Sequence, residues 1–105
     1  MKTSEVLRAA RGRIEVPERW TKGKFAKNEC GQEVYYRDPK ATCWCAMGAI
    51  CAVANYFAEE SAAFRALSSQ INRSIAVWND SFKRIHPEVL AAFDKAIAER
   101  EAMGD

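Results

Sequence analysis

Three of the four cysteines in this chain lie in one apolar stretch, where a thiol could be either reactive or buried. The stretch covers residues 41–51 and contains Cys43, Cys45 and Cys51. A cysteine near a helix N-terminus has a lowered thiol pKa, and it becomes a nucleophile when an imidazole base stands beside it. The single histidine, His86, could be that base. The residue types therefore allow a thiol-dependent enzyme that uses Cys45 or Cys43 with His86.

Such an enzyme also needs a side chain that orients the base, and Asn79 or Asp80 could do so. Residues 42–46, Thr-Cys-Trp-Cys-Ala, resemble over a short length the Cys-Trp-Ala segment that begins the nucleophile helix of papain-like proteases. The order along the chain differs from that family, because here Asn79 and Asp80 precede the histidine. Buried cysteines and a helix-capping histidine explain the same residues without catalysis. The thiol enzyme is therefore an alternative hypothesis.

The cysteine spacing does not predict a metal site. Structural zinc takes four Cys or His ligands, commonly in pairs separated by two residues. On one helix Cys43 and Cys45 would point about 200° apart, and Cys51 would lie about 120° from Cys45. Cys43 and Cys51 nearly share a face, but two turns separate them. The five glycines are scattered and form no phosphate-binding loop. We expect neither a metal nor a cofactor.

Positive charge is concentrated in the first part of the chain. Residues 1–40 carry ten Lys or Arg and six Asp or Glu, whereas residues 41–105 carry six and eight, so the two parts differ in sign. Basic residues interleaved with aromatic ones are typical of surfaces that bind single-stranded nucleic acid. A solvated helix face and a basic loop would have the same composition, so nucleic-acid binding is a second alternative. The residues that would form this surface are Arg19, Trp20, Lys22, Lys24, Phe25 and Lys27.

Helix signals dominate the rest of the pattern. Thr3 or Ser4 can cap a first helix that ends near Pro17. A small hairpin is expected next, with strands near residues 25–28 and 33–37 around a turn in which Gly31 supplies a positive φ. Residues 43–57 are apolar almost all round, which predicts a buried central helix. Gly48 inside that helix predicts that a neighbouring element passes close to it.

Two further helices complete the predicted fold. One begins near Glu59, and its apolar stripe continues through Ile71 to Ile75. Asn79 or Asp80 is expected to cap a short turn over residues 81–84. The last helix begins at Pro87 and runs to about residue 101. The prediction is a mainly α (α+β) single domain over residues 1–105, with four main helices and the hairpin between the first helix and the central apolar helix.

Three short motifs carry a resemblance to a known family. They are the Cys-Ala-Met-Gly-Ala-Ile segment at residues 45–50, the Trp-Asn-Asp segment at 78–80, and the Glu-Val-Leu and Asp-Lys-Ala-Ile segments within residues 88–97. The chain resembles, over roughly residues 4–98, a family of small uncharacterised proteins from bacteria and their phages. The resemblance implies a shared architecture and no particular activity. It singles out Cys45, Gly48, Asn79 and Asp80.

We interpret the chain as a non-enzymatic binding or accessory module, whose partner is another protein in a phage or mobile-element context. The expected surface is either the turn formed by Trp78, Asn79 and Asp80 together with Gly48, or the basic segment 19–27. A purely structural interpretation is that Asn79 and Asp80 cap a turn and Gly48 admits a close helix. No signal-like or membrane-spanning segment is visible, so we expect a cytoplasmic protein without membrane contact. The sequence leaves the oligomeric state open.

Overall fold

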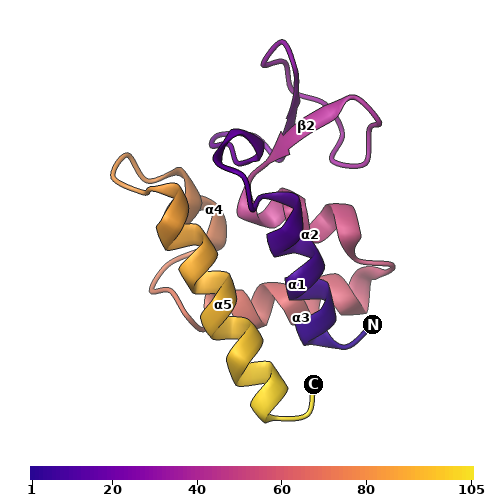
Figure 1. Cartoon of the computed structure of the whole chain (residues 1–105), viewed down its shortest axis with the longest axis vertical. Helices are drawn as coiled ribbons and strands as arrows, with labels where there is room; N and C mark the ends of the chain where they lie inside the picture. The colour runs from indigo at the N-terminus through magenta and orange to yellow at the C-terminus, as the bar shows by residue number, and fades with distance from the viewer.

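Apolar residues at helical spacing give this chain five α-helices, and a short hairpin projects from one end of them (Figure 1). The computed structural model describes all residues, 1–105. The predicted mainly α fold with a small β-hairpin between the first helix and the central apolar helix is confirmed. The elements in chain order are α1 (Thr3–Arg13), η1 (Pro17–Arg19), β1 (Ala26–Asn28), β2 (Ala41–Trp44), α2 (Ala46–Val53), α3 (Phe57–Ser68), α4 (Ile75–Asp80) and α5 (His86–Ala102).

The core forms around α1, which packs against α2, α3 and α5. Val6 and Leu7 on α1 and Phe93 on α5 are fully buried, as expected for helices with one apolar stripe. The long C-terminal helix α5 lies beside α1 (Figure 1), and its predicted extent agrees with the structure to within one residue at each end. None of the helices combines the length and the apolar character needed to cross a membrane.

The hairpin uses a different second strand from the predicted one. The turn is as expected, since Gly31 has a φ of 79° and the Asn28 Oδ1 accepts from the backbone N–H groups of Cys30 and Gln32, at 3.0 Å each. Glu33 forms only a single bridge with β1, because the chain bends away in a turn over residues 35–38. The antiparallel partner of β1 is β2, so the prediction of a strand over 33–37 was wrong.

The predicted central helix over residues 43–57 is interrupted at both ends. Cys43 lies on the strand β2, and the helix α2 begins only at Ala46 because Cys45 has an extended backbone and is its N-cap. At the other end the helix stops at Val53, and α3 starts at Phe57. An apolar run is compatible with a buried strand as well as a buried helix, and here it contains both.

The third helix is also shorter than predicted. Its apolar stripe continues to Ile75 in sequence, but α3 ends at Ser68 and a separate helix, α4, begins at Ile75. Ser74 caps α4, because its Oγ accepts from the Val77 N–H at 3.2 Å. The expected capping of a turn over 81–84 by Asn79 or Asp80 was therefore wrong, since both residues are the last ones of α4.

Candidate functional site

Asn79 is a fully buried polar residue at the point where α4, α2 and the segment after η1 meet. Its Oδ1 accepts from the indole N–H of Trp20 at 2.7 Å and from the backbone N–H of Ala46 at 3.1 Å. Its Nδ2 donates to the carbonyl of Thr21 at 3.1 Å and to the carboxylate of Asp80 at 3.0 Å. These bonds use both lone pairs and both protons of the amide. The side chain therefore joins three segments and has no free group for a ligand.

Asp80 extends this network toward the surface. Besides Asn79, its Oδ1 accepts from the backbone N–H of Gly23 at 2.9 Å. The neighbouring Lys22 Nζ donates to the carbonyl of Ser81 at 2.7 Å. The basic segment is thus attached to the C-terminal end of α4 by charge-assisted bonds in both directions.

Cys45 belongs to the same cluster, as the resemblance implied, and its role is to cap α2. Its Sγ accepts from the backbone N–H of Gly48 at 3.2 Å, and its own N–H donates to the carbonyl of Phe25 at 3.2 Å. The residue is only 5% exposed. Burial raises the pKa of the Cys45 thiol above its ordinary value of 9.0, with a smaller contribution from the Asp80 carboxylate, and the helix N–H groups oppose this only in part. The thiol is protonated at neutral pH, unlike an activated nucleophile.

Gly48 confirms the predicted close approach. A Cβ at this position would lie 1.9 Å from the carbonyl oxygen of Phe25 and 2.7 Å from its carbonyl carbon. The neighbour is the backbone that enters β1, and not a helix as the structural interpretation supposed. Glycine is required here because no side chain fits between the two backbones.

A small recess lies beside this cluster. Its volume is about 100 Å³, and Cys45, Asp80, Phe25 and Ala76 line it together with residues 23–24. Ligand pockets for small molecules usually start at about 300 Å³, so this recess has room for a few water molecules. It is too small for an organic substrate.

The remaining residues of the hypothetical thiol site are elsewhere. Cys43 on β2 points its Sγ to the carbonyl of Lys27, 3.9 Å away. His86, at the start of α5, donates from Nε2 to the carbonyl of Ile14 at 2.6 Å. No hydrogen bond joins His86 to Cys43 or Cys45. No group of three or more His, Cys, Asp or Glu side chains could hold a metal ion.

The aromatic side chains of the basic segment are partly occupied by the protein itself. The Trp20 indole donates to Asn79, and its ring centre lies 5.4 Å from Lys22 Nζ and 6.0 Å from the His86 ring centre. Lys24 lies 3.6 Å from a carboxylate oxygen of Glu33. Arg19 is exposed and has no partner, and Lys27 is half-buried on β1. The segment presents positive charge, its Trp20 is half-buried beside Lys22, and its Phe25 is 40% exposed.

The turn between α4 and α5 carries a feature that sequence reasoning missed. Phe82 is 97% exposed, more than any other large hydrophobic residue of the chain. Trp78, in α4 just before this turn, is buried, and the Arg84 guanidinium lies 4.2 Å from its ring centre. No signal in the sequence indicates this exposure, because Phe82 continues the helical spacing of Ile75 and Trp78 and is typical of a core residue.

The fold and this cluster define a small helical domain in which two of the motif segments, residues 45–50 and 78–80, meet and hold a surface turn in place. The chain belongs to the DUF6197 family, a family of unknown function, whose sequence model matches residues 1–99. The predicted membership of an uncharacterised family of small proteins is thereby confirmed. No curated protein and no solved structure matches the chain.

Proposed function

We propose that this chain is a non-enzymatic protein-binding module and that the turn carrying Phe82 is its main contact with the partner. The observation behind this proposal is that Phe82 is 97% exposed while the backbone on both sides of it is hydrogen-bonded. Burying one phenylalanine side chain is worth about 1.5–3 kcal/mol. An exposed phenylalanine on an ordered turn does not contribute this energy to the stability of the fold, and it is typical of a binding surface.

The turn is ordered by contacts on each side of Phe82. Before it, the carbonyl of Ser81 accepts from Lys22 Nζ. After it, Arg84 donates from its backbone N–H to Ser81 at 2.9 Å and from Nε to the carbonyl of Trp78 at 3.0 Å. A side chain on such a turn loses little conformational entropy when it binds, which favours affinity. Aromatic residues held in this way are common hot spots of interfaces.

The charge around the turn indicates the chemistry of the partner. Cationic side chains come from the turn itself and from the segment attached to it, and the partner surface is therefore acidic with an apolar pocket for Phe82. The motif resemblance to proteins of bacteria and their phages supports a partner encoded by a phage or by its host. The cations are Arg19, Lys22, Lys24, Lys83 and Arg84.

The alternative functions have weaker support. A thiol enzyme needs an accessible thiolate, whereas the pKa of the Cys45 thiol is raised and the residue is buried. Nucleic-acid binding through residues 19–27 needs several free aromatic faces, whereas Trp20 is half-buried beside Lys22 and only Phe25 is exposed.

Site-specific photo-crosslinking in cells tests the proposal. A photoreactive phenylalanine analogue at position 82 should crosslink to a protein, and the same analogue at Phe57, which is 79% exposed on a helix start rich in acidic residues, should not crosslink to that protein. The crosslinked protein is then purified and its affinity measured. We expect Phe82→Ala to weaken binding by about 30-fold, the effect of a hot spot of about 2 kcal/mol, and Phe57→Ala to have no effect.

Two results would overturn the proposal. One is equal affinity of the Phe82→Ala and unchanged proteins for the crosslinked protein. The other is crosslinking at position 82 to nucleic acid, with an affinity that falls steeply with salt. Because Phe82 is exposed, its replacement leaves the folded core intact, and an unchanged melting temperature verifies this.

A further inference from the structure

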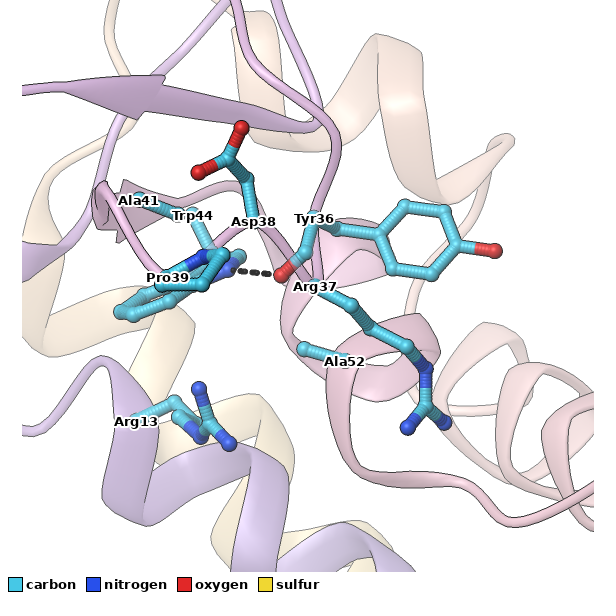
Figure 2. A pocket seen from close by; sticks show the side chains of 8 residues that line it. All are labelled: Arg13, Tyr36, Arg37, Asp38, Pro39, Ala41, Trp44 and Ala52. Carbon is cyan, nitrogen blue, oxygen red and sulfur yellow. Dashed lines mark hydrogen bonds between the residues drawn. The ribbon is translucent and has the colours of Figure 1, made fainter.

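A second hollow lies on the side of the molecule where the loop of residues 36–41 passes over the C-terminal end of α1 (Figure 2). Its volume is about 320 Å³, within the range of small-molecule sites. Its walls are Arg13 from α1, Pro39 from the loop, Trp44 from β2 and Ala52 from α2. None of these residues belongs to the Phe82 turn or to the Asn79 cluster.

Arg13 is a positioned guanidinium without an acceptor. Its Cζ lies 5.1 Å from the ring centre of Trp44, so the aromatic face holds the cation in place. Arg8, Arg11 and Arg84 each donate to a carboxylate, but no carboxylate or carbonyl of the protein accepts a hydrogen bond from Arg13. The planar donor fork of Arg13 is therefore available at the wall of the hollow.

The other two charged side chains that line the hollow already have hydrogen-bond partners in the protein. Arg37 donates to the carbonyl of Ala54, and Figure 2 shows its guanidinium turned away from Pro39 and Trp44. The Asp38 carboxylate accepts from the backbone N–H of Lys40 at 2.8 Å, and it points away from Arg13 in the same view (Figure 2). Of the three charged residues that line the hollow, Arg13 is thus the one whose side chain has no hydrogen-bond partner in the protein.

Part of the lining is flat and apolar, beside the polar atoms of residues 36–38. The Trp44 indole is fixed by the hydrogen bond from its Nε1 to the carbonyl of Tyr36 at 2.9 Å, drawn as a dashed line in Figure 2. Pro39 from the loop and Ala52 from α2 also line the hollow (Figure 2). Apolar walls beside a few oriented polar groups are the usual composition of a small-molecule site.

We propose that this hollow binds a small aromatic carboxylate. The carboxylate accepts a bidentate pair of hydrogen bonds from the Arg13 guanidinium, which matches carboxylate geometry. The ring of the ligand packs against Pro39 and the edge of Trp44. The site is separate from the proposed protein-binding turn, so the two proposals stand or fall independently.

The test is a nuclear magnetic resonance titration of the whole chain with benzoate, followed at the indole N–H signal of Trp44. Benzamide, the neutral analogue, and acetate, which has no ring, are titrated in parallel. We expect benzoate to shift the Trp44 signal saturably at millimolar concentrations. Each of the two analogues should bind at least about tenfold more weakly than benzoate, because benzamide lacks the negative charge and acetate lacks the ring.

Variants assign the effect to Arg13. Arg13→Gln should weaken benzoate binding by about tenfold, the loss expected for one charge-assisted pair. Arg65→Gln is the matched control, because Arg65 is also an exposed arginine in the last turn of a helix without a carboxylate partner, and it should bind as the unchanged protein does. The Arg13 variant should fold normally since it loses no hydrogen bond within the protein. The proposal is wrong if benzoate gives no saturable shift, if benzamide or acetate binds equally well, or if Arg13→Gln has no effect.

Discussion

Replacing Asn79 by alanine should strongly destabilise the protein, because the side chain is fully buried and makes four hydrogen bonds. Each bond contributes about 1 kcal/mol to stability, so the free energy of unfolding should fall by about 4 kcal/mol. A domain of this size has a total stability of about 5–15 kcal/mol. The expected fall in melting temperature is roughly 15 °C or more.

The assay is urea and thermal unfolding followed by circular dichroism. Asn55→Ala is the control, because Asn55 is exposed and its side chain makes no hydrogen bond, and it should change stability by less than about 0.5 kcal/mol. A loss of less than about 1 kcal/mol in Asn79→Ala would refute the view that Asn79 holds the three segments together.

Asn79→Asp separates the accepted bonds from the donated ones. The introduced carboxylate can still accept from Trp20 and from the N–H of Ala46, but it has no proton for the Thr21 carbonyl and it repels Asp80. Burial and this repulsion raise the pKa of the introduced carboxyl in the folded state. A raised pKa means that the stability is present at low pH and is lost as the pH rises through the folded-state pKa. The variant should therefore regain stability on acidification relative to Asn79→Ala, and an equal pH profile for the two variants would contradict this.

The remaining predictions concern Gly48 and the thiols. Gly48→Ala should destabilise the protein by about 3 kcal/mol in urea unfolding, because its Cβ would overlap the Phe25 carbonyl. Gly12→Ala, in a helix with nothing within 4 Å of the new Cβ, should instead stabilise it by about 0.5–1 kcal/mol. In the native protein iodoacetamide should label exposed Cys30 first, whereas buried Cys45, whose thiol pKa is raised from 9.0, should react only above that pH or after unfolding. Fast labelling of Cys45 at neutral pH, detected by mass spectrometry, would contradict this prediction and support the hypothesis of a thiol-dependent enzyme.

The local signals in the sequence predicted most of the helices, and long-range pairing explains what they missed. The stripe of α1 and the proline at the start of α5 are sufficient to place those helices. Residues 43–44, the end of β2, were assigned to the central helix because an apolar run does not distinguish a buried strand from a buried helix. Only the pairing with β1, which is distant in sequence, decides for a strand.

Cys45, Gly48, Asn79 and Asp80, which the motifs singled out, lie together in the structure, but their chemistry was not predictable from their types. Cys45 and Asn79 meet at the N-terminal end of α2, where the thiol caps the helix and the amide binds the Ala46 N–H. A cysteine and an asparagine in these roles look the same in the sequence as a nucleophile and its orienting partner. Burial and the number of hydrogen bonds made by Asn79 distinguish the two interpretations, and both depend on the tertiary structure.

The Asn79 cluster and the exposed Phe82 turn are connected by hydrogen bonds. In the proposed function Asn79 and Asp80 position the turn, whereas Phe82 contacts the partner. Asn79 and Asp80 hold the basic segment against the end of α4, and Lys22 from that segment binds the carbonyl of Ser81, where the turn toward Phe82 begins. A substitution of Asn79 should therefore weaken partner binding only together with stability, whereas Phe82→Ala should weaken binding at constant melting temperature. If both variants lost binding in proportion to stability, Phe82 would be a structural residue and not the contact. Because the Phe82 side chain is exposed, we expect Phe82→Ala to lose binding without losing stability.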